Sequence, residues 1–305
     1  MKSGFIAVDW GTARVTARVV GGEAALPVWR ETVRLSDLDA GGIAGRVEAL
    51  ATMWPGAAAN GMVLSGMIGS ASGWREVART ACPADADAVA AGAWHGSVGR
   101  QGVTILPGLA CRSRFGDSDV LRGEEVPAIG TLSLLEGRPA QFLSVPGMHG
   151  KWIRLDDGRV RDFHTAMTVE LHGALAAHTV LSPLMSSPAR DGDTFRAGVR
   201  RGASGALARH LFAVRAAVLA GSITEEAAHG FLWGILAGAD AVDAVVPGET
   251  CFIAGVPEVA ALYAAAIETL GGKPRQIDGE TLAVAGYLAL APKLAGQESR
   301  RWANV

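Results

Sequence analysis

The stretch Phe5-Ile-Ala-Val-Asp-Trp-Gly-Thr-Ala-Arg-Val-Thr-Ala-Arg-Val-Val20 decides how the rest of the chain is interpreted. Its first four residues predict a buried strand, and apolar and polar residues alternate beyond Gly11-Thr12, which is typical of a β-hairpin. Asp9 ends the first strand beside the turn, where a carboxylate can hold a hydrated Mg²⁺ while the N–H groups of the turn face phosphate oxygens. An ordinary hairpin explains the same residues equally well, and no G-x-x-x-x-G-K-[ST] motif occurs.

Composition excludes several classes of protein. The chain has 305 residues, enough for two domains, with 49% hydrophobic and 19% charged residues. A net charge of −2 and a pI of about 6.4 give no electrostatic footprint for nucleic acid or an anionic membrane. The three cysteines lack metal-ligand spacing and fit a reducing compartment. No apolar run is long enough to span a bilayer, and the chain runs directly into a strand, so we expect a cytoplasmic protein.

Hydroxyls and glycines follow the next predicted strand, Met62-Val-Leu64. The loop reads Ser65-Gly-Met-Ile-Gly-Ser70, and Trp74 lies in the same segment. Ligands bind beyond the carboxyl ends of strands in α/β sheets, so this loop is a candidate binding site. A plain strand-to-helix turn is the alternative interpretation.

Two adjacent carboxylates occur in Leu121-Arg-Gly-Glu-Glu125. Apolar residues recur at helical spacing from Val126 onward, so Glu124 and Glu125 are predicted in the first turn of a helix. The helix dipole favours the ionised form there, and such a carboxylate can take a proton from a substrate hydroxyl. Taken alone, the pair is more simply explained as a routine acidic first turn.

The second half of the chain repeats the opening design of strand, glycine turn and strand. Phe142–Val145 predicts a strand, and Pro146-Gly-Met-His-Gly-Lys-Trp152 predicts a turn leading into another one. Lys151 could pair with a phosphate, although a lone lysine is more often a solvated surface residue. The Ala- and Gly-rich helices expected at 228–246 and 281–292 could pack internally or between two subunits, so a homodimer is one option.

The order of these blocks resembles that of the sugar kinases of the actin/hexokinase/Hsp70 superfamily, and within it the 2-dehydro-3-deoxygalactonokinase family. The resemblance runs from Ile6 to Gly286. The blocks that carry it are Gly66-Met-Ile-Gly-Ser70 with Gly73-Trp74, Leu121-Arg-Gly-Glu-Glu125, Pro146-Gly-x-His-x-Lys-Trp152 and Thr165-x-Met-Thr-x-Glu-Leu171. Each block is weak alone, but together and in this order they are specific.

The resemblance implies an α/β fold of two ribonuclease-H-like domains, each a mixed five-stranded sheet with flanking helices, around an interdomain cleft. It places the sugar-acid side and the first phosphate hairpin in residues 1–115, and the second hairpin and the adenosine side in 116–305. It further implies phosphorylation of the 6-hydroxyl of 2-dehydro-3-deoxy-D-galactonate by ATP and Mg²⁺, a step in galactonate breakdown.

The family pattern also implies roles for individual residues. Asp9 would hold Mg²⁺ through water, and Glu124 would be the catalytic base, with Glu125 as the next candidate. The residues expected to bind ATP, besides Asp9, are Gly11, Thr12, Gly147, Met148, His149, Lys151 and Gly255. Those expected on the substrate side are Arg14, Ser65, Gly66, Ser70, Trp74, Arg122, Thr168 and Glu170. Of these, Arg14 and Arg122 are candidates to bind the carboxylate of the acid, because a guanidinium matches its geometry.

This sequence departs from the family pattern at a few expected contacts. Met148 and Val169 stand where threonine and glycine are usual, Thr16 where arginine is usual, and Val256 where a small hydroxyl residue is usual. These changes motivate a second hypothesis, a nucleotide- or sugar-acid-binding protein that has lost the transfer chemistry. A phosphohydrolase on the same fold is a third. The sequence does not distinguish the galacto from the gluco epimer, or another 2-keto-3-deoxy sugar acid.

Overall fold

The computed structural model describes residues 4–22, 28–135, 138–145 and 147–302. The chain divides into two compact units that interleave along the sequence. Unit 1 consists of Met1–Arg138, Leu155–Phe163 and Glu280–Val305, and unit 2 of Pro139–Arg154 and His164–Gly279. In the part of the chain that is described, no helix is both long and apolar enough to cross a membrane.

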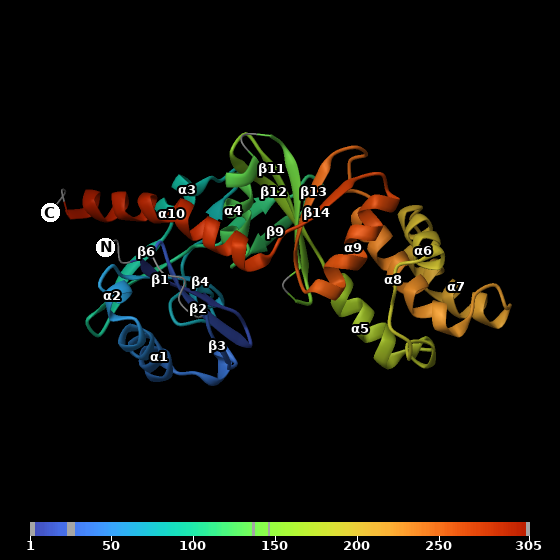
Figure 1. Ribbon diagram of the computed structural model, residues 1–305, viewed down its shortest axis with the longest axis horizontal. Coiled ribbons are helices and arrows are strands. Elements are labelled where there is room, and N and C mark those ends of the chain that lie inside the picture. Colours follow the sequence, from blue (N-terminus) through green and yellow to red (C-terminus); the bar gives the residue numbers. More distant parts are fainter. Residues whose placement is uncertain (1–3, 23–27, 136–137, 146, 303–305) are drawn as a thin grey trace. The chain divides into compact units, whose positions relative to one another are not determined.

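Unit 1 is built on a mixed sheet that starts from the predicted hairpin (Figure 1). The strand order is β3-β2-β1-β4-β7-β6, with β1 Phe5–Trp10, β2 Arg14–Val20, β3 Trp29–Thr32, β4 Met62–Gly66, β6 Trp94–Val98 and β7 Gln101–Ile105. Strands β1, β4 and β7 are parallel, whereas β2, β3 and β6 are added antiparallel. The hairpin is confirmed, and the N–H of Gly11 closes its turn by donating to the carbonyl of Arg14 at 2.8 Å.

The prediction of five strands is wrong for this sheet, which has six among the described residues. The extra strand, β6, lies in a segment, 81–102, that is rich in Ala, Gly and Asp, a composition more typical of surface connections than of strands. Its residues are largely half-buried, and Gly96 pairs with Val103 of β7. An edge strand of this kind lacks a continuous apolar run, so it is hard to recognise from sequence.

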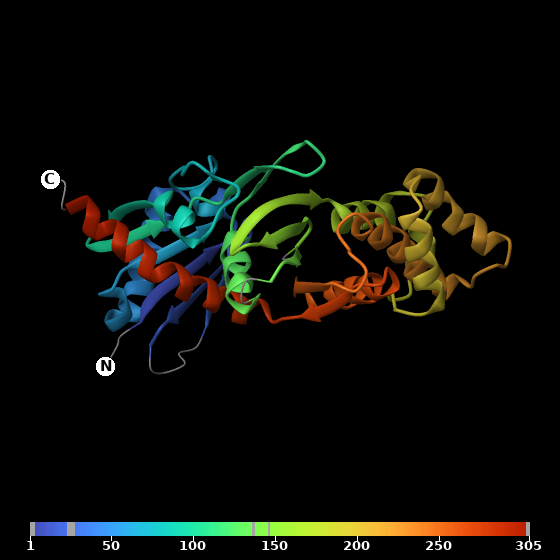
Figure 2. The same ribbon diagram turned by 90° about the horizontal axis from the view of Figure 1, so that it is seen from above.

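Helices cover both faces of the first sheet. Below it in Figure 1 lie α1 (Ala40–Met53) and α2 (Pro55–Ala58), whose buried residues join the core around Trp10. Above it lies the long helix α10 (Gly279–Trp302), which Figure 2 shows in red passing over the blue strands. Helix α10 packs closely on α4 (Glu125–Leu135), because a Cβ on Gly130 would lie 2.1 Å from the carbonyl oxygen of Leu282 and one on Gly286 2.0 Å from that of Val126.

A small sheet leads from the first sheet to α4. It consists of β5 (Thr80–Ala81), β8 (Leu109–Arg112) and β9 (Ser118–Leu121), and α3 (Ala86–Ala91) follows β5. Strand β9 ends at Leu121, so it delivers the chain directly to the Arg122–Glu125 turn.

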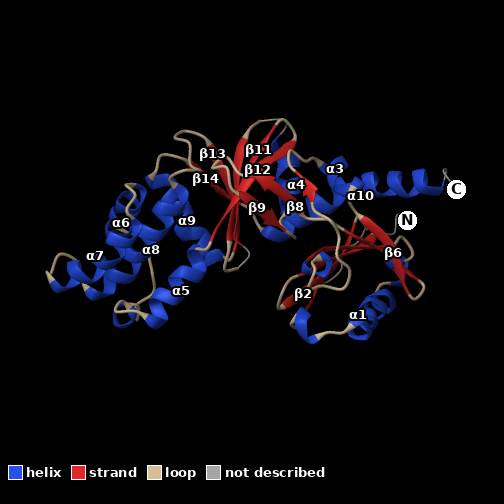
Figure 3. Ribbon diagram, turned by 180° about the vertical axis from the view of Figure 1, so that it is seen from behind, coloured by secondary structure: helices blue, strands red, loops and turns tan. Residues whose placement is uncertain are grey.

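Unit 2 contains most of a second sheet and a group of helices. The strand order is β12-β11-β10-β13-β14, with β10 Ala140–Val145, β11 Gly150–Asp156, β12 Arg159–Ala166, β13 Thr250–Gly255 and β14 Lys273–Gln276. The helices, which Figure 3 shows grouped beside these strands, are α5 Thr168–His178, α6 Asp193–Ala203, α7 Leu207–Leu219, α8 Glu225–Ala241 and α9 Pro257–Thr269. Residues 155–163 of the β11–β12 hairpin count with unit 1.

The glycines of α8 serve internal packing. A Cβ on Gly234 would lie 2.1 Å from the carbonyl oxygen of Phe195, and one on Gly238 would lie 2.1 Å from that of Val199, both in α6. Glycine also makes room on the α6 side of this contact, because a Cβ on Gly202 would lie 2.0 Å from the carbonyl oxygen of Ile235. The small residues therefore let two helix backbones approach closely within one chain.

Candidate active site

The carboxyl ends of β1 and β4 bring Asp9 beside Ser65. The two residues are paired in the parallel register, and Trp10 is paired with Gly66. The Asp9 side chain is exposed, yet protein atoms crowd it on most sides. Burial raises the pKa of Asp9 above its ordinary value, while the charges of Arg18 and Arg14 and a hydrogen bond from Ser65 act in the opposite direction. This edge of the sheet therefore presents one accessible carboxylate held by neighbouring cations.

Ser65 also links this edge to helix α10. Its Oγ lies 2.7 Å from the hydroxyl oxygen of Tyr287, which is fully buried. Burial raises the pKa of Tyr287, and the negative charge of Asp9 adds to that effect, so the phenol stays neutral. Arg18 is itself buried and donates to the carbonyl of Glu280 at 3.4 Å. Asp9 thus has a hydrogen bond from Ser65, which Tyr287 holds in turn, and lies within the field of the Arg18 charge.

The Arg122–Glu125 turn lies against the same edge. Gly123 has φ +107°, and a Cβ placed on it would lie 3.4 Å from the Cα of Gly66 and 3.8 Å from Oδ1 of Asp9. A residue with a side chain would be strained in this conformation, and its Cβ would be in van der Waals contact with Gly66 and Asp9. The glycine in the predicted Arg-Gly-Glu-Glu block therefore places the turn that carries Glu124 against Asp9 and Gly66, within unit 1.

The two adjacent glutamates differ sharply. Oε2 of Glu124 accepts from the backbone N–H of Arg122 at 3.1 Å, and the side chain remains half-buried. Glu125 is fully buried; its Oε2 accepts from the N–H of Gly123 at 2.6 Å, and its Oε1 has no partner among the described residues. Burial raises the pKa of Glu125 to about 7. The expectation that the helix dipole favours the ionised form is therefore wrong for Glu125, because desolvation outweighs the dipole.

Arg122 is held beside the loop that follows β4. Its Nη2 donates to the carbonyl of Val77 at 2.8 Å, and its Nη1 lies 2.8 Å from where a Cβ on Gly69 would stand. Both Nε and Nη1 are buried without a hydrogen-bond partner among the described residues. Burial lowers the pKa of Arg122, and the nearby charge of Arg79 lowers it further. These N–H groups are available to bind an anionic group that reaches them.

The rest of the 65–74 loop is folded tightly on itself. Ser70 donates from its Oγ to the carbonyl of Met67 at 2.7 Å, and the N–H of Trp74 donates to the carbonyl of Ile68 at 3.0 Å. The Trp74 ring meets Trp94 edge-on, with centroids 6.0 Å apart. Ser70 is buried and Trp74 half-buried, so they shape the loop at least as much as they line a binding surface.

The first turn offers Thr12 to solvent. Gly11 is half-buried, and its N–H is used within the turn, whereas Thr12 and Arg14 are exposed. The carbonyl of Thr12 accepts from the N–H of Leu35 at 3.0 Å, which fixes the turn against the segment after β3. A phosphate would therefore meet this turn near Thr12 rather than at the N–H of Gly11.

The second turn lies at the carboxyl edge of the second sheet. Gly147, Met148 and His149 are exposed, and Pro146 lies outside the described residues. Strands β10 and β13 are in parallel register, with Val145 paired to Gly255, so Gly255 lies at the same edge. This arrangement brings the expected nucleotide residues of unit 2 together.

Helix α5 holds the second turn in place. Nε2 of His149 lies 2.6 Å from Oε2 of Glu170, and the N–H of Glu170 donates to the carbonyl of Met148 at 3.3 Å. Lys151 follows on β11 and is only 8% exposed. Thr168 is buried as well, and its hydroxyl donates to Asp240 at 2.8 Å.

Sequence analysis missed four residues that support these positions: Arg18, Val77, Asp240 and Tyr287. Asp240 carried a signal, because it is a carboxylate that follows a long apolar run in its helix. Tyr287 carried none, since its partner Ser65 is far away in the sequence. No group of three or more His, Cys, Asp or Glu residues that could hold a metal occurs among the described residues.

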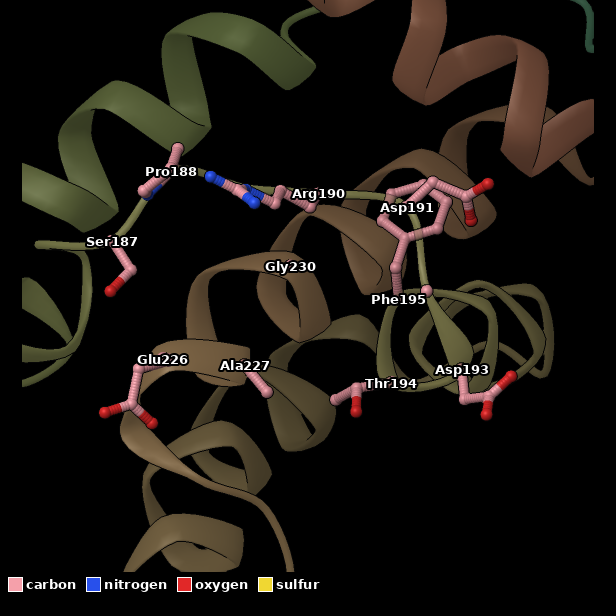
Figure 4. Close-up of a pocket in the computed structure, with 11 residues that line it drawn as sticks. Ser187, Pro188, Arg190, Asp191, Asp193, Thr194, Phe195, Glu226, Ala227 and Gly230 are labelled. Atoms are coloured by element: carbon pink, nitrogen blue, oxygen red, sulfur yellow. The ribbon is translucent and has the colours of Figure 1, made fainter.

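Figure 4 shows a surface pocket in unit 2, between the 187–195 segment and the start of α8, with a volume of about 410 Å³. The pocket is lined by Ser187, Pro188, Arg190, Asp191, Gly192, Asp193, Thr194, Phe195, Glu226, Ala227 and Gly230. None of the residues expected to bind ATP or the sugar acid belongs to this lining.

Comparison with known proteins identifies relatives along nearly the whole chain. The sequence profile of the 2-keto-3-deoxy-galactonokinase family matches residues 9–290. The 2-dehydro-3-deoxygalactonokinase of Escherichia coli (strain K12) is 30% identical over 299 residues, which cover 97% of this chain and 100% of the relative. A Rhizobium meliloti protein named for the same activity is 32% identical over 306 residues, covering 94% of this chain and 96% of the relative.

Solved structures agree with these matches. A crystal structure from Sinorhizobium meliloti that carries the same family name has a TM-score of 0.84 and 30% identity, covering 94% of this chain and 98% of that chain. Component A of the (R)-2-hydroxyglutaryl-CoA dehydratase of Acidaminococcus fermentans has a TM-score of 0.52 at 10% identity, covering 96% and 100%. The second likeness concerns the fold alone, which is of the actin/hexokinase ATPase type.

Proposed function

Because the chain belongs to the 2-keto-3-deoxy-galactonokinase family, we propose that it transfers the γ-phosphoryl group of ATP to the 6-hydroxyl of 2-dehydro-3-deoxy-D-galactonate. The observation that supports this most directly is the cluster in unit 1. There Gly123, which precedes Glu124, lies against Asp9 and Gly66, and Arg122 has unpaired buried donors beside Gly69. The cluster therefore contains a carboxylate to accept the proton of the hydroxyl, a second carboxylate to bind Mg²⁺, and a guanidinium to bind the carboxylate of the sugar acid.

Glu124 is the proposed catalytic base. Its side chain is half-buried and belongs to the turn that lies against Asp9, whereas Glu125 is fully buried and bonded to the N–H of Gly123. In the reaction, the bond between O6 and its hydrogen breaks as Glu124 takes the proton, a bond forms from O6 to the γ-phosphorus, and ADP leaves with the electron pair of the broken P–O bond. General base catalysis of this kind contributes about 10²–10⁴-fold. Glu125 orients the turn through Gly123.

Asp9 suits Mg²⁺ bound through water. Mg²⁺ retains several waters and uses one or two carboxylates together with substrate phosphates, so it does not need a cage of protein ligands. The single accessible carboxylate at the end of β1, without a three-residue metal cluster in the described part of the chain, matches that preference. When bound, Mg²⁺ would neutralise charge on the phosphates during transfer.

Arg122 is the proposed partner of the substrate carboxylate. Leaving a buried donor unsatisfied costs about 1–3 kcal/mol, and Arg122 has two such N–H positions within the described structure. An anionic group that reaches this guanidinium satisfies donors and offsets the cost of burying its charge. Arg14 is less suited to this role, because it is exposed and its charge already acts on Asp9. Ser65, Gly66, Ser70 and Trp74 form the neighbouring loop.

The turn of unit 2 is proposed to bind the phosphates of ATP, with Gly147, Met148, His149 and Lys151. Lys151 is buried at the start of β11, and a phosphate would compensate its charge there. Gly255 lies at the same strand edge and would approach the adenosine. We assign Thr168 and Glu170 a supporting role, since their side chains bind Asp240 and His149.

Two departures from the family pattern have physical accounts. Val169 packs against the hydrophobic core of unit 2, where it replaces a glycine with an apolar contact. Met148 is 56% exposed on the second turn, so it leaves the backbone of the turn unchanged and removes only a hydroxyl. We therefore expect weaker ATP binding rather than loss of transfer.

A coupled assay of ADP release tests the proposal. Purified protein with ATP and Mg²⁺ should release ADP only when a 2-keto-3-deoxy sugar acid is added, with the galacto epimer used better than the gluco epimer. Glu124→Gln should lower kcat by about 10²–10⁴-fold and change both KM values little. Phosphate release without an acceptor would indicate a phosphohydrolase, and sugar-acid binding in a calorimeter without product would indicate a binding protein. Either result contradicts the kinase proposal.

The finer features of the expected architecture remain part of this proposal. They are two ribonuclease-H-like domains, 1–115 and 116–305, around an interdomain cleft where both phosphate turns bind one ATP. A crystal structure with a non-hydrolysable ATP analogue tests the shared nucleotide. The cytoplasmic location and the homodimer are also predictions, and light scattering of the purified protein tests the second.

A further inference from the structure

One carboxylate in unit 2 collects hydrogen bonds from three different elements. Oδ1 of Asp240, in the last turn of α8, accepts from Nε1 of Trp152 on β11 at 2.8 Å. Oδ2 accepts from the hydroxyl of Thr168 on α5 at 2.8 Å and from the hydroxyl of Tyr263 on α9. We propose that Asp240 is the positioning residue of the second phosphate turn, an inference that rests on the proposed function because it assumes that residues 147–149 bind ATP.

The first connection runs through helix α5. Thr168 is the first residue of α5, and the preceding Met167 provides no side-chain cap. The bond from Thr168 to Asp240 therefore fixes the start of this helix. Two residues later, Glu170 bonds to His149 with its side chain and to the carbonyl of Met148 with its N–H. A displacement of the first turn of α5 would consequently move the phosphate turn.

The second connection runs through strand β11. Trp152 lies three residues beyond His149, is fully buried, and contacts the ring of Tyr263 with centroids 6.0 Å apart. Its indole N–H is held by Asp240 at 2.8 Å. The phosphate turn is thus fixed on one side by Thr168 and on the other by Trp152, through the same carboxylate.

The side chain at this position has to offer two polar atoms to its three partners. Three donors converge on it, and each would be left unpaired in a largely buried place if the side chain were apolar. Burial raises the pKa of Asp240, and the three donors together with the charge of His164 oppose that change. Asparagine can serve the same partners, with its oxygen facing the indole and its amide donating to the two hydroxyls, which then act as acceptors.

Two single substitutions separate positioning from stability. Thr168→Val removes the bond that fixes α5, whereas Tyr263→Phe removes a bond to the same oxygen from α9, which does not carry the turn. Thr168→Val should raise the KM for ATP about tenfold, the effect expected of one charge-assisted hydrogen bond. The KM for the sugar acid should change less than about threefold. Tyr263→Phe should leave the KM for ATP within about twofold while lowering the melting temperature.

Substitution of Asp240 itself completes the test. Asp240→Ala should raise the KM for ATP at least as much as Thr168→Val, and Asp240→Asn should restore most of the affinity. Hydrogen–deuterium exchange without any ligand should show faster exchange in peptides covering 147–152 and 168–171 for Asp240→Ala and Thr168→Val, but not for Tyr263→Phe. Equal effects of Thr168→Val and Tyr263→Phe on both readouts would overturn the inference. The exchange result stands even if no sugar acid is phosphorylated, so failure of the kinase proposal is recognised separately.

Discussion

Replacing Glu125 by glutamine should stabilise the protein at alkaline pH and not at acid pH. Burial raises the pKa of Glu125 from its ordinary 4.5 to about 7. One pKa unit corresponds to about 1.4 kcal/mol, so the folded chain holds this proton about 3 kcal/mol more tightly than the unfolded chain does. Between these two pKa values the folded protein keeps the proton and the unfolded chain releases it. Stability from this group therefore falls as the pH rises from 4.5 to 7, and glutamine avoids the loss.

Urea unfolding at a series of pH values from about 4.5 to about 8 measures this effect. The difference in unfolding free energy between Glu125→Gln and the natural protein should be near zero at the acid end and about 3 kcal/mol at the alkaline end. Because the chain has two compact units, the transition that reports unit 1 has to be compared. Glu124→Gln is the matched variant, because it removes a carboxylate from the same turn at a half-buried position. A pH-independent difference for Glu125→Gln would refute the reasoning, because it would mean that Glu125 takes up no proton on folding.

Three further predictions follow from the same contacts. Arg122→Met should raise the KM for the sugar acid about 10–100-fold and leave the KM for ATP within about threefold. It should not lower the melting temperature, because it also removes unpaired buried donors. A larger rise in the KM for ATP than in the KM for the sugar acid would contradict the role of Arg122. Gly123→Ala should cost about 1–2 kcal/mol of stability at φ +107°, and relief of that strain should displace the turn that carries Glu124 and lower kcat; circular dichroism and the ADP assay check both. His149→Ala and Glu170→Gln should each raise the KM for ATP. The KM of the double variant should be no higher than that of the more affected single variant, which a double-mutant cycle measures.

Local patterns predicted the first hairpin and the strands around it well. The alternation across Phe5–Val20 and the short apolar run at Met62–Leu64 need no information from distant residues, and both appear as strands. The small sheet of β5, β8 and β9 went unrecognised, because Thr80–Ala81 is only two residues long and gains its partners from a segment that is distant in sequence. A strand that short has no period to detect.

The different environments of the two glutamates could not be derived from their sequence. Glu124 and Glu125 are neighbours, so a helix or helix start turns their side chains in different directions. Which one enters the protein interior depends on how α4 lies against α10, and that contact is set by Gly130 and Gly286. Sequence reasoning therefore located the pair, whereas only the packing shows that Glu125 is the buried one and that its pKa rises.

Glycines connect the sequence patterns to the site more reliably than the charged residues do. Gly66, Gly69 and Gly123 each leave room that a side chain would occupy: the first two beside Asp9 and Arg122, and the third beside both Gly66 and Asp9. A charged residue can be placed on any surface, but a glycine with close backbone neighbours fixes which segments approach one another. The blocks at 66–70 and 121–125 are therefore informative because their glycines require β4 and the start of α4 to meet at the end of β1. That approach brings the turn of residues 122–125 to Asp9 and Gly66.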